Sequence, residues 1–471
     1  MTETKQTQRL PRWLAPAAIG GVSAAAALGI AWLITDVAGH KHEARDRFVR
    51  VVELDESVVD PAVWGRNFPD QYDGFVRTVD TQRTRFGGSE ALPRATTADD
   101  TRVSVSRSLL EEEPRLIRMW AGYAFSIDYR EKRGHAYMLE DQTFTGRQQK
   151  PQPGTCMACH ASTVTAWRSL GDGDLAAGAS AMAAMPYAEA RTHVDRAIAC
   201  IDCHDPESMA LRVTRPAFID AMRVVKAREG LPNYDVNRSA SRAEMRSYVC
   251  AQCHVEYYFE GPGKALVLPW RRGLQADQML DHYDAIGFSD WSHASTQAPM
   301  LKPQHPEFEL WSQGTHARAG VTCVDCHMPY QRVGAKKITD HHVRSPLLDI
   351  NRACQTCHNA PESELLARAE GIQAKTVAMT EVGLEALMGL LDHLEAAERG
   401  GATPEQLSAA RQAQRRATWY LDFILAENSS GFHAPQEAAR VLFLAMDSIR
   451  SGHLVLAGVA NATPAPPREA G

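Results

Sequence analysis

The chain has 471 residues, of which 44% are hydrophobic, and a formal net charge of −6. This length allows one large or two moderate hydrophobic cores. A mildly acidic chain without a basic stripe lacks the charge pattern of a nucleic-acid-binding protein. We therefore expect a folded protein that has no nucleic-acid partner.

An uncharged segment near the N-terminus is long enough to cross a membrane. Basic residues precede Trp13–Ile34, and this run of 22 residues contains no charge. As a helix it would extend about 33 Å, whereas the apolar region of a cleaved signal peptide is usually about 7 to 15 residues long. These features favour an uncleaved anchor over a cleaved signal peptide. We predict a cytoplasmic N-terminus over residues 1–12, a signal anchor or transmembrane helix over residues 13–35, and a connector over residues 36–60.

All ten cysteines fall in five C-x-x-C-H units. In such a unit the two thiols form thioethers with haem, and the histidine ligates the iron. A zinc site would not need a histidine directly after every second cysteine, and neither would a disulfide. The sequence therefore predicts five covalently bound haem c groups within residues 61–360. The attachment cysteines are Cys156, Cys159, Cys200, Cys203, Cys250, Cys253, Cys323, Cys326, Cys354 and Cys357, and the proximal ligands are His160, His204, His254, His327 and His358.

The C-terminal region, residues 361–460, has the pattern of long helices. Apolar residues recur at helical spacing from Val377 to Leu394, and two glycines at 400 and 401 end the run. Thr403, Pro404 and Gln406 form the start of a second helix that extends to about Ala426, and Pro435 begins a third. We expect a mainly α protein with little β structure, built around five packed haems. We also expect these helices to contact a second copy of the chain, and residues 461–471 to be disordered.

Three longer motifs carry a family resemblance. CAQCHVEYYF begins at Cys250, SDWSHASTQAPMLKPQHPEFELW follows it, and GTHARAGVTCVDCHMP contains the fourth cysteine pair. These motifs closely resemble the pentahaem, ammonia-forming cytochrome c nitrite reductases. The resemblance extends from about Arg133 to His358 and resumes at GFHAPQE, about half of the chain. It implies reduction of nitrite to ammonium by a haem enzyme with an open iron position, four bis-histidine haems acting as an electron wire.

The resemblance also implies the distal ligands of four haems. They are His135, His316, His341 and His433, with His342 as an alternative to His341. No distal histidine is matched for the haem at Cys156 and Cys159, so the iron on His160 is expected to be the open one. The best-known members have a lysine at this proximal position, and members with a histidine form a separate branch.

The same resemblance implies the active-site residues. Tyr257 and His305 match the family's active-site tyrosine and histidine, and Arg147 would hold the nitrite anion, with Arg133 as the alternative. His305 would deliver protons, and Tyr257 would donate a hydrogen bond or a proton. The residues implied for a calcium ion are Glu256, Lys302 and Gln304, with the backbone carbonyl of Tyr257. Arg271 and Arg272 occupy a stretch that is often acidic in calcium-binding members, and a guanidinium there could replace the metal.

Two other functions share these motifs. A pentahaem electron carrier would close the fifth iron with a further histidine, such as His193, His282 or His293. A related multihaem oxidoreductase would act on hydroxylamine, sulfite or tetrathionate instead of nitrite.

Because haem is attached outside the cytoplasm, we expect the body of the protein to lie on the periplasmic side of the bacterial inner membrane, either anchored or soluble after signal cleavage. The expected partners are nitrite, a membrane-bound multihaem quinol dehydrogenase or another periplasmic electron donor, and a second copy of the chain.

Overall fold

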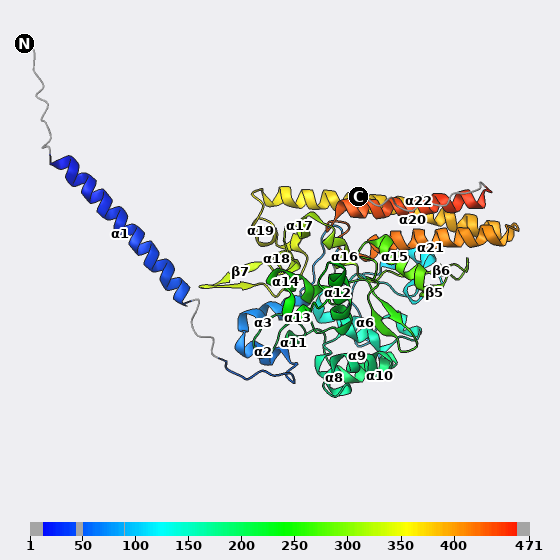
Figure 1. Ribbon diagram of the computed structural model, residues 1–471, viewed down its shortest axis with the longest axis horizontal. Helices are drawn as coiled ribbons and strands as arrows, with labels where there is room; N and C mark the ends of the chain where they lie inside the picture. Colours follow the sequence, from blue (N-terminus) through cyan, green and yellow to red (C-terminus); the bar gives the residue numbers. More distant parts are fainter. Residues whose placement is uncertain (1–12, 44–49, 89, 459–471) are drawn as a thin grey trace, which may run out of the picture. The chain divides into compact units, whose positions relative to one another are not determined.

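A computed structural model describes residues 13–43, 50–88 and 90–458 (Figure 1). The chain divides into two units, residues 1–51 with 331–338 and residues 52–330 with 339–471. The expected N-terminal segment 1–12, residues 44–49 of the expected connector and the expected tail 461–471 lie outside the described residues. The expected domain boundaries remain predictions.

The first helix, α1 (Leu14–Glu43), belongs to the smaller unit. Within it, Pro16–Gly39 is long and apolar enough to cross a membrane, and the side chains of this stretch are exposed. A signal sequence meets the same criteria, so the helix is compatible with a retained anchor and with a cleaved signal. The helix continues beyond residue 35, and the first residues of the expected connector are therefore helical.

The N-terminal half of the larger unit is built from short helices. Several begin with side-chain caps, as in α2, where the Asp60 carboxylate accepts a hydrogen bond from the Ala62 N–H and Pro61 is the first helical residue. These helices are α2 (Pro61–Asn67), α3 (Pro69–Val76), η1 (Arg77–Val79), α4 (Leu109–Glu112), α5 (Arg115–Met119), η2 (Ala124–Ser126), η3 (His135–Tyr137), α6 (Met138–Thr143), η4 (Gly146–Gln149), η5 (Gly154–Cys156), α7 (Met157–His160), α8 (Val164–Leu170), α9 (Leu175–Ala183), α10 (Tyr187–Ala190) and η6 (Arg191–His193).

The remaining C-x-x-C-H units lie in or next to short helices as well. The helix of the fourth unit has a capping box, in which Thr322 and Asp325 satisfy each other's backbone N–H groups. The helices of this part are α11 (Cys200–Cys203), α12 (Pro216–Arg228), α13 (Val236–Ser239), α14 (Arg242–Ala251), α15 (Ala276–Ile286), α16 (Glu307–Ser312), α17 (Thr315–Arg318), α18 (Cys323–His327), η7 (Pro346–Leu348) and α19 (Ile350–Ala353).

The β structure consists of four two-stranded sheets among the described residues. The sheet β3–β4 is antiparallel and pairs Tyr258 with Val267. The strands are β1 (Leu92–Pro93), β2 (Ser104–Val105), β3 (Tyr258–Glu260), β4 (Ala265–Val267), β5 (Trp291–Ser292), β6 (Pro299–Met300), β7 (Tyr330–Val333) and β8 (Lys336–Thr339). Since each strand is two to four residues long, the expectation of a mainly α fold with little β structure is confirmed.

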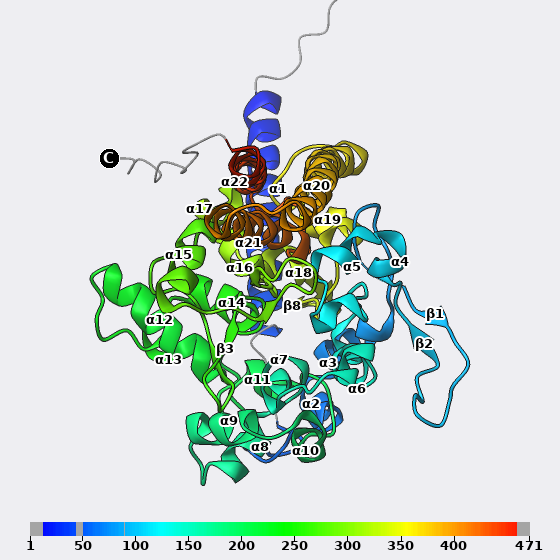
Figure 2. The ribbon, with the colours of Figure 1, turned by 90° about the vertical axis from the view of Figure 1, so that its right-hand side faces the viewer.

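Three long helices form the C-terminal part, α20 (Glu362–Arg399), α21 (Pro404–Ala426) and α22 (Pro435–Leu456). They pack side by side, as Figures 1 and 2 show. The starts of α21 and α22 are those predicted, and Thr403 and Gln406 form the expected capping box. The first helix begins well before the expected apolar run, because Pro361 precedes it and acidic residues occupy its first turn. Leu387 of α20, Trp419 of α21 and Val441 of α22 are fully buried in the main core.

Candidate haem ligands and active site

Among the described residues of the larger unit, four pairs of histidine rings join the expected proximal ligands to the expected distal ones. Each pair joins a histidine of a C-x-x-C-H unit to one from elsewhere in the chain. The ring centroids are 6.2 Å apart for His254 and His135, 6.4 Å for His204 and His341, 6.2 Å for His358 and His316, and 6.3 Å for His327 and His433. Two imidazoles that ligate opposite sides of one metal ion, with metal–nitrogen bonds of about 2 Å, have centroids roughly 6 Å apart. The four pairs therefore have the spacing of axial ligands, and His254 also has a second ring nearby, that of His305, with the centroids 6.4 Å apart.

The Nδ1 atoms of four of these eight histidines form a hydrogen bond with the protein. The Nδ1 atoms of His204 and His341 lie 3.0 and 2.9 Å from the backbone carbonyl oxygens of Met209 and Thr339. Similarly, His327 Nδ1 contacts the carbonyl oxygen of Arg344 at 3.1 Å. An imidazole that donates its Nδ1–H in this way leaves Nε2 as the nitrogen available to a metal.

A carboxylate takes the place of the carbonyl at two of the ligand candidates. The Glu427 side chain accepts a hydrogen bond of 2.6 Å from His433 Nδ1. Burial lowers the pKa of His433, but the Glu427 carboxylate outweighs burial and leaves this pKa raised. His254 Nδ1 lies 3.7 Å from a carboxylate oxygen of Glu307. A carboxylate partner makes the imidazole a stronger ligand than a carbonyl does.

His342 lies next to His341 but has different surroundings. It is buried, and neither of its ring nitrogens has a hydrogen-bond partner among the described residues. Its backbone N–H donates to Asp340, and the charges of Arg344 and Arg77 act on its ring. The ring that faces His204 is that of His341.

The first C-x-x-C-H unit packs against the third. Cys253 Sγ lies 3.9 Å from the carbonyl oxygen of Ala158, and its thiol lies beside that of Cys159. Arg215, which is fully buried, donates to the carbonyl oxygens of Ala158 and Ala161 at 2.6 and 3.1 Å. The short helix α7, which ends at His160, is therefore fixed along its length and at its C-terminal end.

His160 has surroundings unlike those of the other four proximal histidines. Its Nδ1 contacts the Met138 carbonyl oxygen at 3.1 Å, but among the described residues no second histidine ring faces it as in the four pairs. Burial lowers the pKa of His160 to about 4, and nearby His305 and Arg147 lower it as well. His160 therefore lies near the imidazole of His305 and the guanidinium of Arg147, whereas each of the other four proximal histidines has a histidine ring opposite it.

Arg147 is held by a short loop and an aromatic ring. Its guanidinium donates to Gln142 Oε1 at 3.0 Å and lies 4.5 Å from the centre of the Phe125 ring. The loop is fixed because Asp128 accepts hydrogen bonds of 2.8 Å from the Thr145 hydroxyl and the Gly146 N–H. The charge of Arg147 also acts on Cys156. Arg147 therefore lies close to the first cysteine pair.

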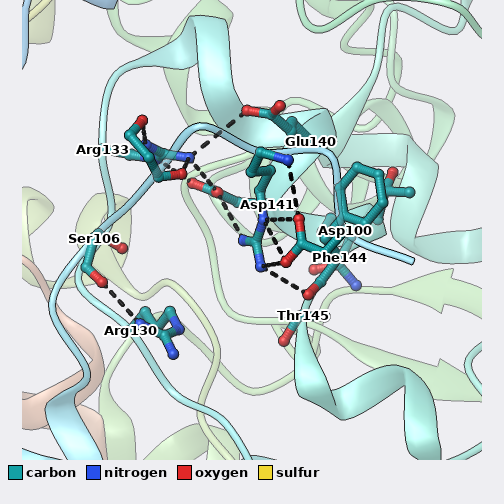
Figure 3. Close-up of polar contacts among 12 residues, drawn as sticks. Asp100, Ser106, Arg130, Arg133, Glu140, Asp141, Phe144 and Thr145 are labelled. Carbon is teal, nitrogen blue, oxygen red and sulfur yellow. Dashed lines mark hydrogen bonds and ion pairs between the residues drawn. The ribbon is translucent and has the colours of Figure 1, made fainter. Parts of the chain in front are cut away.

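Arg133 is occupied elsewhere, as Figure 3 shows. Its side chain is fully buried and makes two hydrogen bonds of 2.7 Å to the carboxylate of Asp141. A third bond of 2.8 Å reaches the Ser104 hydroxyl. Arg102 joins the same network through Asp100 and Asp141. These contacts give Arg133 a structural role.

His305 and Tyr257 are both brought to this region. Burial lowers the pKa of His305, and its Nδ1 lies 3.8 Å from Glu307. Burial raises the pKa of Tyr257 well above its usual value, and the Cys159 and Cys156 thiols act on it in the same direction. Glu307 is also affected: burial would raise its pKa, but His254 and His305 hold it well below its usual value.

The residues expected around calcium converge on a buried carboxylate. Glu256 is 1% exposed, and its oxygens accept from the Tyr283 hydroxyl at 2.9 Å and the Gln304 N–H at 2.6 Å. The Gln304 side-chain amide lies 3.0 Å from the Lys302 carbonyl oxygen. Burial raises the pKa of Glu256 well above its usual value. A carboxylate buried among neutral donors is costly, so this group of oxygens fits a hard cation.

The Lys302 side chain points away from this group. Its ammonium donates to Asp422 at 2.9 Å and to the Pro303 carbonyl oxygen at 2.7 Å. The rings of Trp120 and Phe125 lie 4.8 and 5.0 Å from it. Lys302 is linked to the Glu256 group through its carbonyl oxygen, which accepts from the Gln304 side chain.

The other candidates of the sequence lie outside the site. Arg271 and Arg272 are exposed, and in the described part of the chain the Glu256 carboxylate accepts hydrogen bonds from Tyr283 and Gln304 and from neither arginine. His293 is fully buried between the Arg118 carbonyl oxygen at 2.9 Å and the Ser295 hydroxyl at 3.4 Å. His282 contacts the Tyr258 hydroxyl, and His193 is exposed. None of these three histidines faces His160 in a ring pair among the described residues.

The carboxylates of Glu307 and Glu427 are the residues that the sequence did not indicate. Neither belongs to a C-x-x-C-H unit. One pattern in the sequence could have indicated Glu307. Two glutamates, Glu307 and Glu309, alternate with the apolar Phe308 and Leu310, and the structure buries all four of these residues at the start of α16. Charged residues are almost never fully buried unless they are paired.

Comparisons with known proteins agree with this geometry. The family model for Cytochrome c552 matches residues 60–466. The chain belongs to the cytochrome c552 family. Cytochrome c-552 of Bacteroides fragilis is 37% identical over 413 residues, which cover 84% of this chain and 76% of that protein. Cytochrome c-552 of Parabacteroides distasonis is 38% identical, over 83% of this chain and 75% of that protein.

A solved structure shares both the fold and part of the sequence. Cytochrome c nitrite reductase of Desulfovibrio desulfuricans matches with a TM-score of 0.73 and 29% identity, over 86% of this chain and 88% of that chain. Its catalytic subunit has two calcium sites. The family resemblance drawn from the sequence is confirmed by these matches, as are the multihaem cytochrome fold and the classification as an oxidoreductase that binds haem c.

Proposed function

We propose that this member of the cytochrome c552 family reduces nitrite to ammonium in a six-electron reaction. The observation that carries the proposal is the contrast between four facing histidine pairs and His160, which has Arg147 and His305 nearby instead. A closed electron carrier has no use for an anion-binding guanidinium and an imidazole beside one proximal ligand. The open position would therefore belong to the haem of Cys156 and Cys159.

The axial ligands follow from the same pairs. His135 would serve the haem of His254, His341 that of His204, His316 that of His358, and His433 that of His327, as their ring spacings support. Covalently bound haem supplies redox-active iron, whose potential depends on its axial ligands and their hydrogen bonds.

The chain's own residues would handle the anion and the protons. Arg147, stacked on Phe125, would hold nitrite by charge-assisted hydrogen bonds. His305 keeps Nδ1 on the Glu307 side, so Nε2 is the atom from which it would deliver a proton. Tyr257 stays protonated because burial raises its pKa, and its hydroxyl would donate a hydrogen bond. Burial of these groups strengthens their electrostatic contacts.

A calcium ion would fit beside the active site. Glu256, the carbonyl oxygens of Tyr257 and Lys302, and the Gln304 side chain would hold it, and the calcium sites of the Desulfovibrio enzyme support this proposal. The exposed position of Arg271 and Arg272 argues against a guanidinium in the metal's place. A bound cation would fix the segment 302–305, to which His305 belongs.

The cellular setting is proposed from the sequence and helix α1. The larger unit would lie on the periplasmic side of the bacterial inner membrane, held by α1 or released from it by cleavage. A membrane-bound multihaem quinol dehydrogenase or another periplasmic donor would supply electrons. The C-terminal helices would form the contact of a homodimer, with support from the exposed side chains of Val382 and Phe443.

The decisive experiment uses the purified, haem-loaded protein. Oxidation of a reduced dye should depend on nitrite, and ammonium should appear at one equivalent per nitrite. Electron paramagnetic resonance of the oxidised protein should show one high-spin haem, or its spin-coupled form, and nitrite should perturb this signal alone. Five low-spin haems that do not respond to nitrite would instead establish an electron carrier. Faster turnover with hydroxylamine or sulfite would establish a related reductase.

A further inference from the structure

One buried carboxylate lies between two histidines that have different proposed tasks. Glu307 is 8% exposed, and its Oε2 lies 3.7 Å from His254 Nδ1 while its Oε1 lies 3.8 Å from His305 Nδ1. The Asn428 side-chain amide donates to Oε1. Glu307 Oε2 and His305 Nδ1 are both buried and have no hydrogen-bond partner among the described residues. The two imidazoles are therefore the groups that this carboxylate can serve.

The backbone keeps the three residues together. The Glu307 N–H donates to the His305 carbonyl oxygen at 2.8 Å, and the Phe308 N–H donates to the His254 carbonyl oxygen at 3.1 Å. The first turn of α16 is thus bonded to both histidines. These contacts hold the backbone of Glu307 next to both histidines, and the hydrogen bond from the Asn428 side chain holds its carboxylate.

We propose that Glu307 is a positioning residue that couples the axial ligand His254 to the proton-delivering His305. The inference rests on the proposed function. A carboxylate next to Nδ1 favours the tautomer that carries the proton there, which leaves Nε2 of His254 for iron and Nε2 of His305 for the substrate. Since one carboxylate serves both rings, a stronger contact with one weakens its contact with the other. A change at His305 is therefore transmitted to the ligand strength of His254.

Glu427 provides a matched comparison. It is also a buried carboxylate on an axial histidine, with a hydrogen bond of 2.6 Å from His433 Nδ1. Its other oxygen accepts from the Ser429 hydroxyl. Glu427 therefore acts on a single imidazole, whereas Glu307 acts on two.

The test is a double-mutant cycle on the haem-loaded protein, read out by the midpoint potentials of the low-spin haems. Glu307→Gln should raise one of these potentials, because the imidazole of His254 loses its anionic partner, and should lower kcat for nitrite about 10–100-fold. His305→Asn should shift the same potential when Glu307 is present and leave it unchanged in the Glu307→Gln background. Glu427→Gln should raise the potential of a different haem and preserve the response to His305→Asn.

Two results would overturn the inference. One is that His305→Asn leaves every low-spin potential unchanged, and the other is that the shifts of Glu307→Gln and His305→Asn simply add. The cycle needs no nitrite, so it remains decisive even if the unmodified protein fails to reduce nitrite, which would contradict the proposed function alone. If Glu307→Gln does not load five haems, Glu307→Asp retains the charge, draws it back from both rings and should give the same effects at smaller size.

Discussion

The buried pair of Lys302 and Asp422 should stabilise both the C-terminal helices and the segment that carries His305. Lys302 is 2% exposed and Asp422 is 0% exposed, and their side chains form a hydrogen bond of 2.9 Å. Asp422 also accepts from Trp120 Nε1 at 2.8 Å. The substitution Lys302→Met would retain most of the side-chain volume and remove the charge, leaving the carboxylate of α21 without its cation.

The expected cost follows from this burial. Removing one partner of a buried ion pair destabilises a protein by about 3–5 kcal/mol, because the other charge remains buried and unpaired. With an m-value of about 4 kcal/mol/M for a chain of this size, the urea midpoint should fall by roughly 1 M. Replacing both residues, as in Lys302→Met with Asp422→Leu, removes the unpaired charge and should restore most of the loss.

The cost should also depend on pH. Burial raises the pKa of Asp422, and Lys302 acts in the opposite direction. Without Lys302 this pKa moves further above the unfolded value of about 3.9. A carboxyl group with a raised folded pKa contributes stability below its unfolded pKa and loses it as the pH rises through the folded pKa. The loss of stability in Lys302→Met should therefore be larger at pH 8 than at pH 5.

Urea unfolding of the haem-loaded protein, followed by tryptophan fluorescence and circular dichroism, measures these effects. Lys375→Met, on an exposed position of α20, is the control for the loss of a lysine charge. An unchanged midpoint in Lys302→Met would refute the reasoning. A double variant with Asp422→Leu that is no more stable than the single variant would refute it as well, because the unpaired carboxylate would then not be the cause.

Three further predictions concern individual site residues. His341→Ala should convert one low-spin haem to high spin in the electron paramagnetic resonance spectrum, whereas His342→Ala should not; the reverse result would make His342 the ligand. Arg147→Lys should raise KM for nitrite about 10–100-fold, since a charged hydrogen bond contributes about 1.5–3 kcal/mol; an unchanged KM would remove Arg147 from the anion site, and Arg133→Lys is the control. Chelation should lower turnover and added calcium should restore it, but not in Glu256→Gln; turnover that is insensitive to chelation would exclude a functional calcium ion.

The helices that could be predicted are those whose signals are local. The start of α21 depends on Thr403, Pro404 and Gln406, which contact each other across one turn, and the structure retains this capping box. The start of α20 was missed because its first turns are largely exposed and carry no strong apolar period. Short helices such as α7 and α11 have four residues each, which is too few for any periodicity to appear.

The residues that hold the site together depend on tertiary contacts. Lys302 and Asp422 are 120 residues apart in the chain, and the sequence around Asp422 reads as one more amphipathic helix. Glu307 is close to His305 in sequence, but its contact with His254 exists only because α16 packs on the third cysteine unit. A sequence motif identifies residues that lie at a fixed spacing along the chain. Partners that meet only in the folded protein have no such spacing, so the sequence does not identify them.

The Nδ1 partners explain how five copies of the C-x-x-C-H pattern can give haems with different properties. His204 and its facing ligand His341 both contact backbone carbonyl oxygens, whereas Glu427 accepts from His433 on the haem of His327, and Glu307 lies 3.7 Å from His254. A carboxylate gives the imidazole more anionic character, which stabilises oxidised iron and lowers the haem potential relative to a carbonyl partner. Since the cysteine and histidine positions of C-x-x-C-H are the same in each case, these differences come from residues other than the attachment cysteines and the proximal histidine. A graded electron path can therefore evolve by substitutions that leave every attachment cysteine and every axial histidine in place.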